Sequence, residues 1–255
     1  MKKIALNLLI ICVVFSSCTQ NADRPPVEPV AQILKDIMSL LVYNQRYLRL
    51  AEDFISYDEH GYPLEKGPFL ERLATGDYLA LRLKTDRLCY KLAKFPSSAS
   101  VDQRRTMAQV GKRYSKYYQM EGQPIPAYDF LAIDGRHYSS ANSKGKIMVI
   151  KCWFISCLPC RQEMPALNQL VKKYADRKDI EFVSLAFDTK EELLDFKKTN
   201  VFNYAIVPAM EDYMRNKLKA DMYPTHILID KHGRMVKVVN KVNELTVALA
   251  HETKK

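Results

Sequence analysis

Two cysteines separated by two residues, Cys157 and Cys160, follow a nearly continuous apolar run over residues 147–154. Such a run is typical of a strand buried on both faces of a sheet, and the residues after Cys160 have helical spacing. The pair therefore falls in the first turn of a helix, where the positive end of the helix dipole favours a thiolate. The short loop also brings the two sulfurs close enough to form a disulfide and to exchange it with a substrate.

Half of a zinc site is the main alternative for a Cys-x-x-Cys pair. A complete site needs a second pair of ligands, and the sequence has no second Cys-x-x-Cys and no closely spaced pair of histidines. His226 and His232 are too isolated to supply one. The pattern therefore favours redox chemistry, and we expect no metal site.

Strand and helix patterns alternate around this motif and predict an α/β domain over residues 122–255. Asp134-Gly135 predicts the turn of a small hairpin, and two apolar runs, 147–154 and 180–187, predict buried strands joined by a helix over 164–177. Later segments predict helices over 191–198, 212–219 and 244–251 and strands over 204–207, 227–229 and 235–239.

The preceding segment, residues 30–121, has apolar residues mainly at helical spacing. The spacing predicts a long helix over 30–55, a second helical pattern over 69–95 that weakens at Gly76-Asp77, and a third helix that starts near Ser100. We therefore expect an α-helical domain here, and none of its residues forms a catalytic pattern.

The amino terminus predicts export. Lys2 and Lys3 precede a short apolar run, and residues 1–18 have the pattern of a secretory signal peptide. Small residues before Cys18 resemble the lipobox of bacterial lipoproteins, which implies lipidation of Cys18. Residues 19–29 contain three prolines and predict an extended tether. We therefore expect a membrane-anchored lipoprotein of the periplasm or cell envelope.

Composition excludes several functional classes. Hydrophobic residues make up 47% and charged residues 27% of the chain, which are ordinary values for a globular protein. The net charge of +10 falls to +8 without the two lysines of the signal peptide and is not concentrated in either half, so we expect no nucleic-acid partner. The glycine positions allow no G-x-G-x-x-G turn for a dinucleotide.

Further motifs flank the cysteine pair in a specific order. Lys144-Gly145-Lys146 precedes the first buried strand, Trp153 stands four residues before Cys157, residues 161–165 read Arg-Gln-Glu-Met-Pro, and Tyr223-Pro224-Thr225 precedes an apolar strand. Over about residues 124–250 the chain thereby resembles the TlpA/ResA-like exported thiol-disulfide oxidoreductases of the thioredoxin superfamily. The resemblance implies a thioredoxin-like fold, a central mixed sheet flanked by helices.

The resemblance also implies roles for single residues. Cys157 corresponds to the nucleophile, Cys160 to the resolving thiol that forms the Cys157–Cys160 disulfide, Glu163 to a partly buried glutamate that manages the proton of the second cysteine, and Pro224 to a cis-proline beside the disulfide. The expected substrate-binding residues are Trp153, Leu158, Pro159, Tyr223 and Thr225, although Trp153 is expected chiefly to pack beneath the loop.

Three departures from the family pattern concern the same region. Leu158-Pro159 replaces the common Gly-Pro between the cysteines, at a position that tunes the redox potential in this family. Ser156 stands where tryptophan often precedes the first cysteine, and Lys151 occupies the place where cytosolic thioredoxins carry a buried acid. The reaction type is expected to persist, while the potential and the substrate groove are expected to differ.

The implied reaction is exchange with disulfide-containing exported proteins in the reducing direction. The resemblance implies a membrane thiol-electron donor of the DsbD/CcdA type and no bound cofactor. A thiol peroxidase of the AhpC/TSA type is the second hypothesis, although Phe154 stands where those enzymes carry a threonine. The third is a lipoprotein interaction module whose helical domain binds a partner and whose redox site is secondary.

Overall fold

The computed structural model describes residues 21–255, which form two compact units. The units divide between Lys116 and Tyr117, inside helix α5 (Val101–Met120), and not at the predicted boundary between residues 121 and 122. The predicted signal peptide over residues 1–18, with Cys18, lies outside the described residues.

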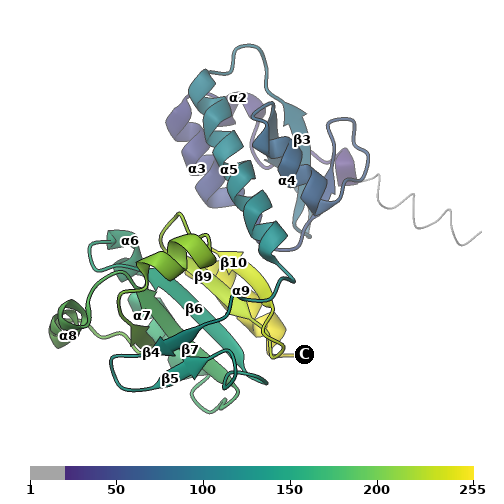
Figure 1. Ribbon diagram of the computed structural model, residues 1–255. Helices are drawn as coiled ribbons and strands as arrows, with labels where there is room; N and C mark the ends of the chain where they lie inside the picture. The colour runs from purple at the N-terminus through teal and green to yellow at the C-terminus, as the bar shows by residue number, and fades with distance from the viewer. Residues whose placement is uncertain (1–20) are drawn as a thin grey trace, which may run out of the picture. The chain divides into compact units, whose positions relative to one another are not determined.

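The first unit combines helices with a three-stranded sheet (Figure 1). In that sheet β1 lies parallel to β3, and β2 lies antiparallel on the other side of β3. The elements before α5 are α2 (Val30–Ile33), α3 (Ile37–Tyr47), β1 (Ile55–Tyr57), α4 (Lys66–Ala74), β2 (Tyr78–Arg82) and β3 (Cys89–Lys94).

The prediction of a purely α-helical segment over residues 30–121 is therefore wrong in part. Helices precede the second unit as predicted, but the helical pattern assigned to 69–95 ends with α4 and continues as β2 and β3. In β2, Leu79, Ala80 and Leu81 are all buried and pair with β3. Leucine and alanine favour helices by intrinsic propensity, and pairing within the sheet overrides that preference.

The start of this unit also differs from the prediction. The long helix expected over 30–55 is divided, because the side chain of Asp36 accepts a hydrogen bond from Ser39 N at 2.7 Å and begins a new helix, α3. The tether expected over 19–29 is packed from residue 21 onward. Ala22 is buried, and Val27 N donates to the Arg82 carbonyl at 2.8 Å along the edge of β2.

Gly111 marks a close approach of α5 to the end of α4. A Cβ atom at this position would lie 2.5 Å from the carbonyl carbon of Leu73 and closer still to Ala74 N. In an exposed helix, alanine in place of glycine stabilises by about 1 kcal/mol. Here the added atom meets backbone that cannot move like a flexible side chain, so the steric cost is larger and the sign reverses.

We expect Gly111→Ala to lower the free energy of unfolding of the first unit by roughly 2–3 kcal/mol, the usual cost of an overpacked core. Urea unfolding followed by far-ultraviolet circular dichroism measures this change. Ser115→Ala on the same helix is the matched control and is expected to change the stability by less than about 0.5 kcal/mol. A Gly111→Ala protein as stable as the wild type would contradict the close approach.

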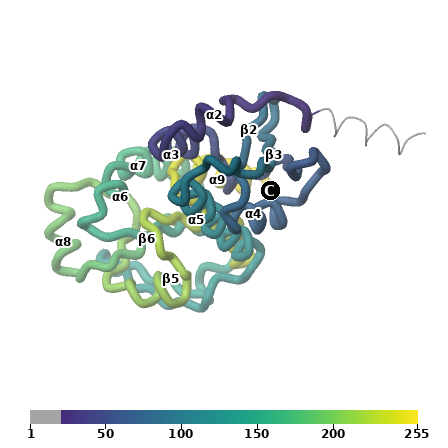
Figure 2. The backbone as a smooth tube through the Cα atoms, turned by 90° about the horizontal axis from the view of Figure 1, so that it is seen from above, coloured from purple at the N-terminus to yellow at the C-terminus, as the bar shows by residue number. Residues whose placement is uncertain are grey.

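The second unit is built on a five-stranded mixed sheet with strand order β10-β9-β6-β7-β8. Strands β6, β7 and β8 are parallel, β9 is antiparallel to β6, and β10 is antiparallel to β9. Figure 2 shows the backbone from above, with α6, α7 and α8 of this unit labelled. The expected mixed sheet flanked by helices is confirmed.

The elements of the second unit follow the predicted order. They are β4 (Asp129–Leu131), β5 (His137–Ser139), β6 (Ile147–Trp153), α6 (Leu158–Gln162), α7 (Met164–Lys173), β7 (Ile180–Ala186), α8 (Lys190–Thr199), β8 (Ala205–Val207), the π-helical turn η1 (Tyr213–Lys217), β9 (Thr225–Ile229), β10 (Met235–Val239) and α9 (Val242–Glu252). All seven residues of the central strand β6 are buried, so packing on both faces of the sheet fixes the position at which the following loop begins.

Candidate active site

The cysteine pair lies where the sequence predicts it, after β6 and at the start of α6. Cys157 is the N-cap residue of α6, and its sulfur accepts a hydrogen bond from Cys160 N at 3.3 Å. A disulfide joins the two residues, whose Cα atoms are 5.3 Å apart. Cys157 is 6% exposed, whereas Cys160 is completely buried. Cys157 is therefore the sulfur that a second protein reaches first.

The loop between the cysteines is partly open to solvent. Leu158 is 55% exposed beside the disulfide, so a bound polypeptide can contact it. Pro159 lies in the first turn of α6, where a missing N–H removes no hydrogen bond. Pro165 in the next helix also lacks an N–H, and the helical segment is broken at Glu163, between α6 and α7.

The second predicted part of the site is the peptide bond between Tyr223 and Pro224, which is cis. The following residue, Thr225, pairs with Cys152 across β9 and β6, so this loop leaves the sheet at the end where β6 runs toward Cys157. Asn240 Nδ2 donates to the Pro224 carbonyl at 2.7 Å and holds the loop to the end of β10. The sequence pattern did not single out Asn240.

Two residues predicted to bind substrate are buried instead. Trp153 is completely buried, with its ring centroid 5.4 Å from that of Phe196 and 5.7 Å from that of Phe202. Thr225 is 1% exposed, and its hydroxyl donates to the Met222 carbonyl at 2.6 Å. The assignment of both residues to substrate contact is corrected: Trp153 packs in the core, as its expected position beneath the loop implies, and Thr225 fixes the backbone before β9.

Three aromatic rings gather at the same end of the sheet. Phe154 follows β6, Phe187 follows β7 and Tyr223 precedes β9, with ring centroids between 5.0 and 5.6 Å apart. The guanidinium of Arg215 lies 5.0 Å from the centre of the Phe187 ring. Burial raises the pKa of Tyr223 to about 12, so its phenol stays neutral. Because the rings come from three separate segments, the sequence pattern did not predict their contact.

Buried polar residues lie beneath the disulfide loop. Lys151 in β6 pairs in register with His226 in β9, and both side chains are completely buried. The Lys151 ammonium forms an ion pair with Glu163 and donates to the Cys160 carbonyl at 3.1 Å. His226 Nε2 lies 3.0 Å from Glu163 Oε1. Glu163 is partly buried as predicted, with 11% of its side chain exposed, but the sequence did not predict its contacts with Lys151 and His226.

Burial and the ion pair set the charges of these groups. Burial lowers the pKa of Lys151 and of His226, although Glu163 offsets part of the effect in both cases. Burial alone would raise the pKa of the Glu163 carboxyl, but the adjacent His226 and Lys151 outweigh burial and hold this pKa below its ordinary value. At neutral pH the carboxylate is therefore ionised and the imidazole neutral.

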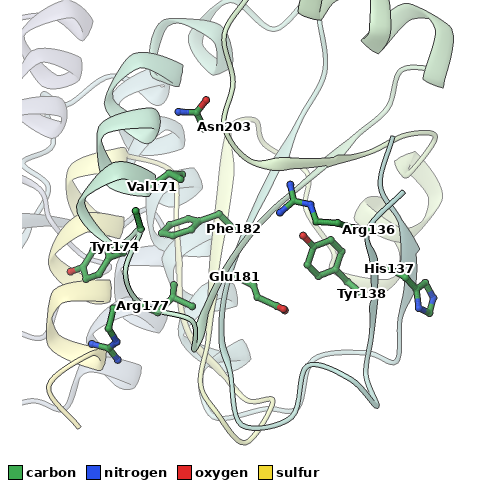
Figure 3. A pocket seen from close by; sticks show the side chains of 11 residues that line it. Arg136, His137, Tyr138, Val171, Tyr174, Arg177, Glu181, Phe182 and Asn203 are labelled. Carbon is green, nitrogen blue, oxygen red and sulfur yellow. The ribbon is translucent and has the colours of Figure 1, made fainter. Parts of the chain in front are cut away.

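A surface cavity of about 370 Å³ lies elsewhere in this unit, between the β4–β5 hairpin, α7 and β7 (Figure 3). Its charged residues already have ion-pair partners: Arg136 pairs with Asp134, Arg177 with Asp179, and Glu181 with Lys146. Neither cysteine lines this cavity. It is therefore not the redox site.

Known proteins resemble the second unit. Residues 122–238 match the AhpC/TSA family. Thioredoxin-like protein YneN of Bacillus subtilis is 32% identical over 120 residues, which cover 44% of this chain and 67% of YneN. The chain belongs to the thioredoxin superfamily, in its TlpA/ResA-like branch.

Two further proteins are similar to the second unit. A solved thiol-disulfide oxidoreductase from Bacteroides fragilis is 18% identical, with a TM-score of 0.46 over 51% of this chain and 98% of its own. Thiol-disulfide oxidoreductase ResA of Geobacillus thermodenitrificans is 26% identical over 119 residues, which cover 46% of this chain and 68% of ResA. With YneN and ResA as relatives, this thioredoxin-superfamily chain is a thioredoxin-like thiol-disulfide oxidoreductase.

Three further structural observations concern the described residues of this thioredoxin-superfamily member. Within residues 21–255, no helix is long and apolar enough to cross a membrane. In the same part of the chain, no group of three or more His, Cys, Asp or Glu side chains is arranged to hold a metal ion. The remaining described cysteines, Cys89 and Cys152, are buried free thiols.

Proposed function

We propose that the chain is an exported, lipid-anchored reductase that exchanges its Cys157–Cys160 pair with the disulfides of other exported proteins. The observation that carries the proposal is the disulfide at the start of α6, with one sulfur near the surface and one buried. The names of YneN and ResA support the reaction type. The leader-like residues 1–18 and Cys18 support export and lipidation.

The mechanism begins with the dithiol form. The Cys157 thiolate attacks one sulfur of a partner disulfide, and the other partner sulfur leaves as a thiolate that takes up a proton. Cys160 then loses its proton to Glu163 and attacks Cys157, which forms the Cys157–Cys160 disulfide and releases the second partner thiol. Two electrons pass from this chain to the partner, and a membrane thiol donor of the DsbD/CcdA type restores the dithiol.

Substrate contact falls on the exposed part of the loop. Leu158 and Pro159 lie beside Cys157, and the backbone of Tyr223 before the cis-proline is the edge to which an extended partner segment adds. Pro224 shapes that edge. The Leu158-Pro159 pair sets which partner side chains fit next to the reacting disulfide.

The reducing direction predicts a low reduction potential. We expect the Cys157/Cys160 couple to equilibrate near about −270 mV, the range of reducing thioredoxins, and not near the ~−120 mV of strong oxidants. The measurement is the oxidised fraction in graded thiol–disulfide buffers, followed by alkylation and mass spectrometry. A potential near the upper value would contradict the reductase direction and leave an oxidase.

The match to the AhpC/TSA family favours one second candidate, a thiol peroxidase. Residue 154 supplies no hydroxyl to such a site, because it is a phenylalanine whose ring stacks on Phe187. The rate at which hydrogen peroxide oxidises Cys157 discriminates the two activities. Oxidation no faster than that of an ordinary thiol at the same pH would exclude the peroxidase.

A further inference from the structure

A charged residue, Lys151, lies in the central strand of the sheet. Lys151 pairs in register with His226 on one side and with Ser184 on the other, and these three side chains are buried among apolar strand residues. Residues directly opposite in a sheet point to the same face, so the three form one row. Burying an ammonium and an imidazole in a core is costly unless both are paired, which implies a role for the partner they share.

That partner is Glu163, which lies at the break between α6 and α7. Its Oε1 atom contacts both the Lys151 ammonium and His226 Nε2. The same ammonium donates to the Cys160 carbonyl, so Lys151 joins the backbone of the buried cysteine to the carboxylate. His226 Nε2 lies 3.0 Å from Glu163 Oε1, whereas its Nδ1 atom has no hydrogen-bond partner among residues 21–255.

Other groups near the cluster hold no charge. Burial raises the pKa of Tyr204 far above its ordinary value, so its phenol stays neutral. Burial likewise raises the pKa of Cys152 to about 12. The Phe202 ring centre lies 5.9 Å from Lys151 Nζ and offers the ammonium a π-face. Among the residues that the structure describes, Lys151, Glu163 and His226 therefore decide the charge of this buried cluster.

We propose that Lys151 and His226 are positioning residues that hold Glu163 ionised beneath Cys160 and so set the pH at which Cys160 releases its proton. The inference rests on the proposed function and deepens it. The proton moves from Cys160 Sγ to a Glu163 oxygen, and the resulting thiolate attacks Cys157 Sγ in the mixed disulfide. Without Lys151 the buried carboxyl binds a proton itself at neutral pH and no longer accepts one.

A two-phase reaction with the aromatic disulfide 5,5′-dithiobis(2-nitrobenzoate) tests the proposal. The reduced full chain is used with the two cysteines of residues 1–18 replaced, Cys12→Ala and Cys18→Ala, so that Cys157 and Cys160 are its reactive thiols. Burial raises the pKa of Cys89 to about 11 and that of Cys152 to about 12. The first phase forms the mixed disulfide on Cys157 and releases one coloured thiolate. The second phase is attack by Cys160, which releases the other, and its rate is followed against pH.

We expect Lys151→Met to slow the second phase about 10-fold at pH 7 and to move its midpoint upward by about one pH unit. His226→Gln is expected to move the midpoint upward by a smaller amount. Lys151→Arg keeps the positive charge, so its midpoint is expected to equal that of the wild type. Ser184→Ala is the matched control, because Ser184 lies in the same row and its hydroxyl has no hydrogen-bond partner among the described residues.

The experiment distinguishes failure of this inference from failure of the proposed function. A wild-type midpoint in both Lys151→Met and His226→Gln, or an equal shift in Ser184→Ala, would overturn the inference. If Lys151→Met does not fold, His226→Gln and Lys151→Arg decide it by the same measurement. A wild-type protein that shows no second phase would instead contradict the proposed function itself.

Discussion

Replacing Cys160 with serine is expected to trap covalent complexes between Cys157 and exported partner proteins. The variant keeps Cys157, the more accessible of the two cysteines, but lacks the completely buried thiol that resolves the mixed disulfide. In cells that produce the variant with its own leader, we expect bands of higher mass on non-reducing gels that disappear on reduction. Mass spectrometry of these bands identifies the partners.

The double variant Cys157→Ser with Cys160→Ser is the control for this trap, because it lacks both sulfurs of the reacting pair. It is expected to form none of the complexes, and the wild type is expected to form them only transiently. Complexes that persist in the double variant would show that another cysteine forms them. The absence of complexes in Cys160→Ser would contradict the proposal that Cys157 forms mixed disulfides with exported proteins.

The second large effect concerns the buried pair of Lys151 and Glu163. Removing one partner leaves the other charge buried without compensation, which costs about 3–5 kcal/mol. We expect Lys151→Met and Glu163→Leu each to destabilise the second unit by that amount, and the double variant by less than the sum of the two. Trp153 is the only tryptophan and is completely buried in this unit, so its fluorescence during urea unfolding reports the change.

The same pair predicts how stability depends on pH. The folded-state pKa of Glu163 lies below its unfolded value of about 4.3, so its contribution is present above that pH and is lost as the pH falls through the folded-state pKa. In Glu163→Gln, Lys151 is left unpaired and its folded-state pKa falls further below the unfolded value of about 10.4. The variant should therefore regain stability as the pH rises toward that value. A pH-independent difference from the wild type would contradict the charge assignment.

The core of the site was predictable because it is local in sequence. A fully apolar strand, a Cys-x-x-Cys pair and a following helical pattern place the disulfide at the end of β6, and Tyr223-Pro224-Thr225 locates the second loop. Other features depend on strand register, which the sequence does not contain. The pairing of Lys151 with His226, and the contact of Phe154 with Phe187 and Tyr223, appear only when β6, β7 and β9 are aligned.

In the first unit, local sequence patterns predicted the wrong secondary structure for β2. Residues 78–82 read Tyr-Leu-Ala-Leu-Arg, and this composition favours a helix. The segment becomes β2 because it pairs with β3, and because the Tyr43 hydroxyl on α3 donates to the Ala80 carbonyl at 3.0 Å and accepts from Arg82 N at 2.8 Å. Such contacts over a long sequence separation override local preference, so periodicity alone assigned the wrong element.

The most direct test of the redox assignment is a single-turnover reaction of the reduced chain with insulin, in the Cys12→Ala and Cys18→Ala background. Alkylation and mass spectrometry follow both proteins at the same time points. We expect one Cys157–Cys160 disulfide to form for each insulin disulfide that is reduced, and no reaction in Cys157→Ser. Insulin that stays oxidised while Cys157 and Cys160 remain thiols would contradict the assignment of this pair as a dithiol reductant.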